Sequence, residues 1–478
     1  MRALRRWSVR HAAGLKAVYD ACSRVAPAFA RPLRLLGRDR GEALLRPIER
    51  LAKETLFDCR MCGTCVLSKT GMACPTNCGK EMRNGPCGGV RADASCEVDP
   101  TMRCVWIEAG EGRARVGAGT GATEMLPPID RRREGRSTWI RVVEGETEPV
   151  TPLPPAIPRD HERPIHAFER ACASGETVVT VEIAPPDSAD PATLLARAER
   201  FRGLVDAINI TDGAGGNCHM SSAAAAAILA ANGHTPVCQI AARDRNRIAV
   251  QGDMLGAAAL GVRDILCITG DDVGQGDHPD AKRVFDLDSI GLLTLARRMR
   301  DDGVFASGRK LEVAPDLFLG ASANPFVPPH EDRIDNLAAK IAAGARFIQT
   351  QFCFDVPRLA RFMERVRERG LDRRAAIVVG VGTLSSAKAL AWMAHHVPGV
   401  HVPAEVIARI AAAKDQRAAG LELLVETIAA VRDIPGVAGI HLMGHRNEDV
   451  LAEAIRRSGL GPAGRAANER PITGGEVR

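Results

Sequence analysis

Eight short runs rich in Val and Ile alternate with Ala-rich amphipathic stretches from residue 176 onward, and this alternation constrains the fold more than any other feature. Short apolar runs predict buried strands, and the stretches between them predict helices. Eight strand–helix units predict an α/β fold, a (βα)8 TIM barrel over residues 176–460. The apolar runs occupy 177–184, 204–211, 236–242, 264–270, 317–323, 346–352, 376–382 and 437–443.

An open, doubly wound sheet is the alternative arrangement of the same units. No G-x-G-x-x-G follows the first apolar run. That absence disfavours a dinucleotide-binding Rossmann domain, whose first strand leads into such a loop.

Eight of the 14 cysteines lie within 46 residues, between positions 59 and 104. The segment opens with C-x2-C-x2-C and continues with Cys74 followed by Pro75. This spacing is typical of [4Fe–4S] ligands, because short gaps let one turn of chain surround several iron atoms. We therefore predict a small cysteine-rich domain over 57–106 that holds two [4Fe–4S] clusters. The predicted ligands are Cys59, Cys62, Cys65, Cys74, Cys78, Cys87, Cys96 and Cys104.

Zinc and disulfides are the rival explanations of these cysteines. Zinc also takes four thiolates, but it usually draws them from two separated C-x2-C pairs. Disulfides require an oxidising compartment, and the basic N-terminus lacks the continuous apolar stretch of an export signal. We expect a cytoplasmic protein with reduced thiols or bound metal.

The positive charge of the chain is concentrated at its start. The formal net charge is +6, yet residues 1–50 carry twelve Lys and Arg against four acids, a surplus of eight. Aromatic residues are only 4% of the chain and do not cluster with the basic ones, so we expect no nucleic-acid partner. No uncharged apolar run of 18 residues occurs, so we predict no transmembrane segment.

The composition divides the chain into five segments. Residues 1–56 form a basic helical arm broken at Pro27, Pro32 and Pro47, and 57–106 form the cysteine-rich domain. Residues 107–175 are rich in Gly, Pro and charge and predict a linker or wrapping segment, in which 139–143 could add a short strand. The barrel follows over 176–460, and 461–478 form a flexible tail.

Polar residues at the ends of the predicted strands mark the functional site, because the chemistry of a TIM barrel lies at the C-terminal ends of its strands. The first strand ends in Glu182 and two prolines. A carboxyl group in the mouth of a barrel is partly desolvated, which suits a general acid. The second strand leads into the glycine-rich segment 211–216, and later strands end in Gly270-Asp271, Asn324 and Gln351.

Taken together, these residues resemble the methylenetetrahydrofolate reductase family, a family of FAD-dependent (βα)8 enzymes. The matching pieces, in strand order, are 181–186, Thr211, 270–271, Asn336 with Lys340, and 350–355. The cysteine-rich segment resembles a companion domain of bacterial members of this family, through Asn84–Gly89 and Cys96–Val98.

The resemblance implies a role for each matching residue. Glu182 would be the general acid and would contact the folate, and Asp271 would hold the pterin ring and influence the flavin. Gln351 would bind the folate, and Lys340 suits the phosphates of FAD. The flavin-binding positions implied by the resemblance are Thr211, Gln239, Thr269, Gly270, Asp271, Phe285, Asn324, Asn336 and Lys340.

Several positions depart from the family pattern. The family commonly has His at Gln239, Arg at Thr269, Tyr at Asn324 and a second basic residue at Ala339. These differences make FMN an alternative flavin. The family also has an aromatic residue that stacks on nicotinamide where this chain has small residues at 383–387. That loss disfavours direct reduction by NADH.

The leading hypothesis is an oxidoreductase that reduces 5,10-methylenetetrahydrofolate to 5-methyltetrahydrofolate, or runs in reverse, with electrons passing through the iron–sulfur domain. It places the protein in one-carbon metabolism and methionine biosynthesis. The expected partners are folate and a redox protein or electron-donor subunit, with homo-oligomer formation left open. The alternative is a barrel that acts on another reduced pterin, with a zinc-stabilised docking domain that has no redox role.

Overall fold

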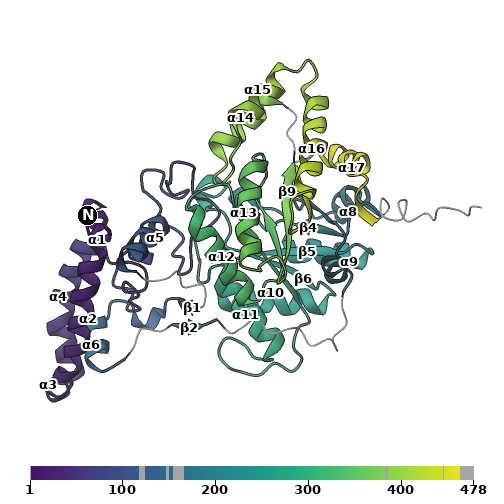
Figure 1. Ribbon diagram of the computed structural model, residues 1–478. Coiled ribbons are helices and arrows are strands. Elements are labelled where there is room, and N and C mark those ends of the chain that lie inside the picture. The colour runs from purple at the N-terminus through teal and green to yellow at the C-terminus, as the bar shows by residue number, and fades with distance from the viewer. Residues whose placement is uncertain are drawn as a thin grey trace, which may run out of the picture.

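The computed structural model describes residues 2–117, 124–146, 150–153, 166–382, 386–444 and 446–462. The predicted tail from residue 463 onward and most of the 383–387 segment lie outside the described residues. In the described chain a helical arm, a cysteine-rich loop region and a closed barrel follow one another (Figure 1). No helix among these residues is long and apolar enough to cross a membrane.

The N-terminal arm consists of four helices that stand to the left of the barrel in Figure 1. The predicted break at Pro27 is present, since a 3-10 turn, Ala26–Phe29, separates α2 from α3. Pro32 and Pro47, in contrast, lie inside helices. Pro47 removes one helical hydrogen bond from α4, but α4 packs against α1 and α6 along its length and continues. The helices are α1 (Arg2–Arg10), α2 (Ala12–Val25), α3 (Ala30–Leu36) and α4 (Arg38–Phe57).

The cysteine module, defined here as residues 58–117, contains little regular structure before its last helix. Its one helical element before α5 is the 3-10 helix Pro75–Asn77, and α5 (Val105–Val116) ends the module. The helix α5 crosses the predicted segment boundary at 106 and packs on α1 and α2. The module is therefore joined to the N-terminal arm.

The segment after the module contains a helix where we predicted a strand. Residues Thr138–Val143 form α6, whose first turn is capped by the Ser137 hydroxyl. The Val-rich pattern suggested a strand, but this cap and the packing of α6 on α4 favour the helix. A two-stranded antiparallel ribbon, β1 (Glu124–Met125) with β2 (Thr151–Pro152), also lies in this segment.

All eight predicted strands form one closed, parallel barrel in the order β10-β3-β4-β5-β6-β7-β8-β9. The predicted TIM barrel is therefore confirmed, and the doubly wound alternative is excluded. The barrel strands are β3 (Val178–Ile183), β4 (Ala207–Ile210), β5 (Pro236–Ala241), β6 (Asp264–Ile268), β7 (Phe318–Ala323), β8 (Phe347–Thr350), β9 (Ala376–Gly382) and β10 (Val437–Met443).

Several of the helices outside the barrel begin at side-chain caps encoded in the sequence. Asp190, Asn246, Asp288 and Asp355 each accept a hydrogen bond from a backbone N–H of the first turn. Apolar faces of these helices pack on the strands and form the main core. The helices are α8 (Pro191–Glu199), α9 (Ser222–Ala231), α10 (Arg247–Ala259), α11 (Ser289–Asp301), α12 (His330–Ala343), α13 (Val356–Glu368), α14 (Ala387–His396), α15 (Ala404–Ala412), α16 (Gln416–Arg432) and α17 (Glu448–Arg457).

An aromatic cluster closes the bottom of the barrel and leaves the other end as its mouth. Phe168, from α7 (Ala167–Ala173), is fully buried and meets Phe318 and Phe347 with ring centroids 5.9 Å and 5.1 Å away. Both partners lie at the starts of their strands. A ligand can therefore enter only from the C-terminal ends of the strands, where the cysteine module lies.

Candidate functional site

A cavity of about 510 Å³ occupies the mouth of the barrel. Its walls include every predicted barrel site residue except Phe285, which packs below Lys80. Residues of the cysteine module complete the wall, among them Lys80, Cys87 and Glu97. The predicted residues that line the cavity are Glu182, Thr211, Gln239, Thr269, Gly270, Asp271, Asn324, Asn336, Lys340 and Gln351.

Glu182 lies at the centre of a polar group contributed by neighbouring strands. Its Oε2 accepts hydrogen bonds from Asn209 Nδ2 and Gln239 Nε2, each 3.3 Å away. His441 Nε2 lies 3.8 Å from the same oxygen, and its Nδ1 is 2.8 Å from the Thr180 hydroxyl. The carboxyl group is thus held in one orientation at the mouth, and His441, which lies near the end of its strand but is not among the predicted site residues, belongs to this group.

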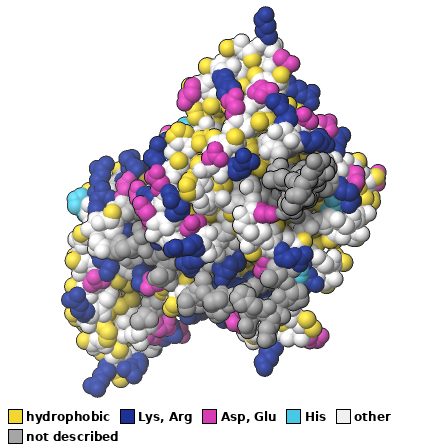
Figure 2. All heavy atoms as spheres, turned by 45° about the vertical axis from the view of Figure 1, so that its right-hand side comes forward, with side chains coloured by type: hydrophobic (Ala, Val, Ile, Leu, Met, Phe, Trp, Pro, Cys, Tyr) yellow, Lys and Arg dark blue, Asp and Glu magenta, His cyan; other side chains and the backbone are white. Residues whose placement is uncertain are grey.

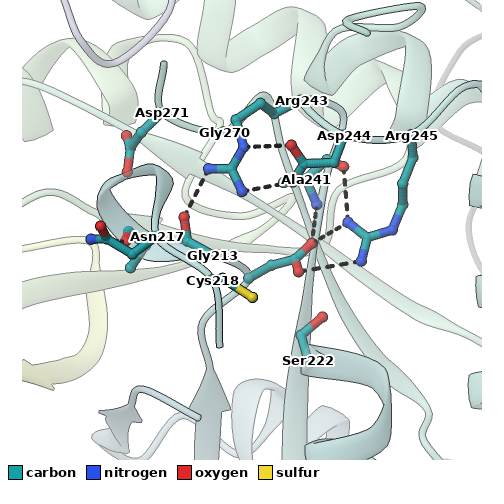
Figure 3. Close-up of polar contacts among 12 residues, drawn as sticks. Gly213, Asn217, Cys218, Ser222, Ala241, Arg243, Asp244, Arg245, Gly270 and Asp271 are labelled. Carbon is teal, nitrogen blue, oxygen red and sulfur yellow. Dashed lines mark hydrogen bonds and ion pairs between the residues drawn. The ribbon is translucent and has the colours of Figure 1, made fainter. Parts of the chain in front are cut away.

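Asp271 contacts the backbone of the glycine-rich loop after β4. Its Oδ2 accepts a hydrogen bond of 2.9 Å from the Gly215 N–H. Two arginines that follow β5 hold this loop in place. Arg243 donates a hydrogen bond to the Gly213 carbonyl, and Arg245 forms an ion pair with Asp212 (Figure 3). These two arginines were not predicted, because they follow their strand by several residues and resemble ordinary loop charges.

The turn between β6 and Asp271 requires glycine. Gly270 has φ +90°, and a Cβ there would lie 3.0 Å from the Arg243 side chain and 3.2 Å from that of Ala241. The Gly270 carbonyl accepts a 2.6 Å hydrogen bond from Lys80 Nζ of the cysteine module. The position of Asp271 is therefore set partly by a residue 190 positions earlier in the chain.

Lys80 is buried and charged. It forms an ion pair with Glu97, and both side chains line the cavity. Burial opposes the charge, but Glu97, Cys87 and Asp271 together raise the pKa of Lys80 above its usual range. The module thus contributes a cation to the barrel mouth, which no spacing in the sequence indicated.

The cavity also contains a second lysine and several buried polar atoms without partners. Lys340 Nζ donates to the Ser322 carbonyl at 2.7 Å, and burial, assisted by Arg333, lowers the pKa of Lys340 to about 8. The Thr211 hydroxyl and both polar atoms of the Gln349 amide are buried without a hydrogen-bond partner. Buried polar groups of this kind indicate a place for a polar ligand, so these residues fit a bound flavin or pterin.

Two cavity residues hold the cysteine module in place. Asn324 Nδ2 donates to the carbonyls of Gly88 and Gly399 at 2.9 Å and 2.8 Å. Arg333 Nη1 donates to the Cys87 carbonyl at 2.7 Å. Asn324, where the family has Tyr, therefore contacts the module here, and its predicted role toward flavin stays a prediction.

The eight cysteines of the module gather into two groups of four. The group farther from the barrel mouth, called distal here, lines one small pocket and consists of Cys59, Cys62, Cys65 and Cys74. The neighbouring Cys59 side chain lowers the pKa of Cys74, while burial and the nearby Cys74 raise the pKa of Cys62. The members of the other group, called proximal because Cys87 lines the mouth, influence one another's pKa values and are Cys78, Cys87, Cys96 and Cys104.

None of these thiols forms a disulfide. Within the described part of the chain, no three His, Cys, Asp or Glu side chains converge closely enough to hold a single metal ion. Four thiols in each group are a donor set that either an iron–sulfur cluster or a zinc ion takes.

A closed parallel barrel with an acid and amides at the C-terminal ends of its strands, and with lysines from α12 and the cysteine module in the same cavity, defines an enzyme of the TIM-barrel class. The family model described as Methylenetetrahydrofolate reductase matches residues 167–459. This match covers more than half of the chain, so the chain belongs to the methylenetetrahydrofolate reductase family, and it is an oxidoreductase of that type. A second family model, described as Methylene-tetrahydrofolate reductase C terminal, matches residues 41–132 and includes all eight clustered cysteines.

Solved structures that resemble this chain are distant in sequence and match it with low TM-scores. An uncharacterized protein from Clostridium thermocellum that binds two copies of 5-methyl-5,6,7,8-tetrahydrofolic acid is 14% identical, with a TM-score of 0.44, and the match covers 61% of this chain and 98% of that one. An F420-dependent secondary alcohol dehydrogenase is 15% identical, with a TM-score of 0.39 and coverage of 59% and 99%. At these scores the likenesses establish neither a ligand nor a reaction for this chain.

Proposed function

We propose that this protein is a flavin-dependent methylenetetrahydrofolate reductase whose electrons arrive through its own cysteine module. The methylenetetrahydrofolate reductase type follows from the family. The flavin and the iron–sulfur clusters are the proposal, together with the roles of individual residues. Reduction to 5-methyltetrahydrofolate and the reverse oxidation use the same site.

The observation that carries the proposal is the position of Cys87. This cysteine of the proximal group lines the same cavity as Glu182, Lys340 and Gln351. Its carbonyl is held by Arg333 of α12, and its thiol lies 3.8 Å from Glu97 Oε1. A cluster bound by the proximal group would therefore border the space available to a flavin. Single electrons could pass from one to the other without a nicotinamide.

The flavin would be held by groups that now lack partners or carry charge. Lys340 supplies a cation for phosphate, while Thr211, Asn336 and Gln349 supply polar contacts. When bound, the flavin supplies a hydride to the methylene carbon of the folate. FAD is the expected form, with FMN as the alternative.

Glu182 performs the proton transfer. The general acid gives its proton to folate N10, the bond between N10 and the methylene carbon breaks, and a hydride adds to that carbon. The proton and the hydride together account for the two electrons and two hydrogens of the reduction. Asn209, Gln239 and His441 hold the carboxyl group for this transfer. Asp271 and Gln351 are proposed to bind the folate.

Metal and flavin content test the proposal directly. Protein purified under strict exclusion of oxygen should contain about eight iron atoms per chain, one flavin, and a brown absorbance that bleaches with dithionite. Zinc in place of iron, with flavin present, would support the docking-domain alternative. A colourless protein free of iron and flavin would end the proposal.

A further inference from the structure

The N-terminal arm exposes far more apolar surface than the rest of the molecule. Of the fourteen large hydrophobic side chains that are exposed among the described residues, ten lie between Leu4 and Leu51. Leu35 is 90% exposed and Leu51 is 70% exposed. Single exposed apolar residues are common on protein surfaces, but such a concentration marks an interaction site.

The exposed residues follow helical spacing on two helices. In α4, Leu44, Ile48 and Leu51 recur at i, i+4 and i+7, which places them on one face. The opposite face of α4 is buried and carries Glu49, Lys53 and Phe57. In α2, Val18 and Val25 recur at i and i+7, and both are exposed. Each helix therefore has one face packed in the molecule and one apolar face without a described partner.

Basic side chains surround these apolar faces. The surplus of eight positive charges in residues 1–50 belongs to the arm, and Arg24, Arg31 and Arg40 are exposed on α2, α3 and α4. Figure 2 shows Lys and Arg side chains interspersed with hydrophobic ones at the lower left, over this end of the molecule. An apolar centre with a charged rim is the composition of a protein–protein interface. A second copy of the same surface would oppose one positive charge with another, so the complementary partner is acidic.

The same two helices reach the distal cysteine group. Tyr19, next to Val18, and Lys53, two residues after Leu51, line a cleft that contains Cys65. Lys53 Nζ lies 3.6 Å from Cys65 Sγ. A protein bound on α2 and α4 would thus be about one helix diameter, roughly 10 Å, from the distal group.

We infer that the exposed faces of α2 and α4 are the docking surface for a small acidic one-electron carrier protein that delivers electrons to the distal cysteine group. The inference rests on the proposed function, because it requires a redox centre at these cysteines. It adds the entry point and the kind of partner, which the family and the barrel site leave open.

The test compares two doubly substituted variants of the full, anaerobically purified protein. Arg24→Glu with Arg40→Glu reverses charge on the arm, and Arg361→Glu with Arg432→Glu makes the same change on exposed positions of α13 and α16. A small acidic ferredoxin, reduced beforehand, is mixed with each protein in a stopped-flow instrument, and the loss of visible absorbance is followed. Reduced methyl viologen serves as a reductant that needs no docking.

The arm variant should react with the ferredoxin at least about tenfold more slowly than the wild type and lose most of its dependence on ionic strength. Its reaction with methyl viologen, and both reactions of the barrel variant, should be unchanged. If the arm variant and the wild type react with ferredoxin at equal rates, the docking inference is wrong, and the proposed function still stands. No absorbance change of the wild type with methyl viologen would overturn the proposed function as well.

Replacing Leu44 and Leu51 with Ser tests the apolar part of the surface with the same measurements and should also slow the reaction with ferredoxin. Light scattering and co-sedimentation with anionic vesicles are run in parallel. A concentration-dependent dimer, or binding to vesicles, that these substitutions abolish would assign the surface to a second copy or to a membrane, and the inference would be wrong.

Discussion

The proposed chemistry depends most on Glu182, whose carboxyl group would donate the proton. Glu182→Gln keeps the hydrogen-bonding shape but removes the transferable proton, so the turnover of methylenetetrahydrofolate should fall by about 10²–10⁴. The flavin content should not change, since Lys340 and Thr211 are untouched. Steady-state assays and flavin release on denaturation measure the two effects. Glu199→Gln, on the exposed end of α8, is the matched control, and full activity of Glu182→Gln would refute the assignment.

Lys340 makes stability depend on pH in a calculable direction. Burial lowers the pKa of Lys340 to about 8 in the folded chain, from 10.5 for a lysine exposed to water. Below pH 8 both states carry the proton and the folded state bears the cost of a buried charge. Between pH 8 and 10.5 the unfolded chain binds more protons than the folded one, so stability rises with pH.

Lys340→Met should remove this rise in the free energy of unfolding, which amounts to about 3 kcal/mol for a pKa shift of this size. Urea unfolding of the flavin-free protein at several pH values between 7 and 10.5 gives the difference between wild type and variant. Lys282→Met, which removes an exposed positive charge, should leave the wild-type profile intact. A wild-type stability that falls across this range relative to Lys340→Met would show that the sign is wrong.

The sequence indicated most of the cavity wall, because the C-terminal ends of parallel strands meet at one mouth whatever the details of packing. It could not indicate what approaches that mouth from elsewhere. Lys80 and Glu97 come from loops of the cysteine module, and Asn324 bonds to Gly88 of that module. Such contacts depend on how two parts of the chain dock. No periodicity or spacing within either part encodes that docking.

At the scale of elements, the barrel depends on α7, a short helix that precedes the first strand. Phe168 of α7 fills the bottom of the barrel between Phe318 and Phe347. Phe168→Ala should lower the free energy of unfolding by about 3–5 kcal/mol, because it leaves a cavity in a closed layer. Phe29→Ala removes a side chain that is 59% exposed and should change stability by about 0.5 kcal/mol or less. Similar losses in the two variants, measured by chemical denaturation, would contradict this role.

The barrel strands could be predicted from the sequence, but the helix in the segment before them could not, and the reason is physical. The barrel strands are buried over most of their length and read as mainly apolar runs bounded by turn residues, as β5 and β9 illustrate. Residues 138–143 are equally rich in β-branched residues, yet they form α6 because Ser137 caps the first turn and α4 supplies a packing surface. Short segments take their structure from such neighbours, so propensity alone gave the wrong answer there.

At the scale of the whole molecule, the arm, the two cysteine groups and the barrel mouth form a continuous series. The distal group borders the arm through Lys53, and the proximal group borders the cavity through Cys87. This order predicts which reductants work. NADH alone should reduce the flavin slowly, because 383–387 offers no aromatic residue to stack on a nicotinamide, whereas one-electron donors should reduce it rapidly.

A pair of cysteine variants separates this electron route from direct reduction. Cys87→Ser removes a proposed ligand of the proximal group and should reduce the expected iron content from about eight to about four atoms per chain. Turnover supported by a one-electron carrier should be lost, while flavin stays bound to Lys340 and Thr211. Cys353→Ser, at a buried cysteine outside the module, should change neither. Rapid anaerobic bleaching of wild-type flavin by NADH, with Cys87→Ser as active as the wild type, would show that electrons bypass the module, because the proximal group would then border the cavity without serving it.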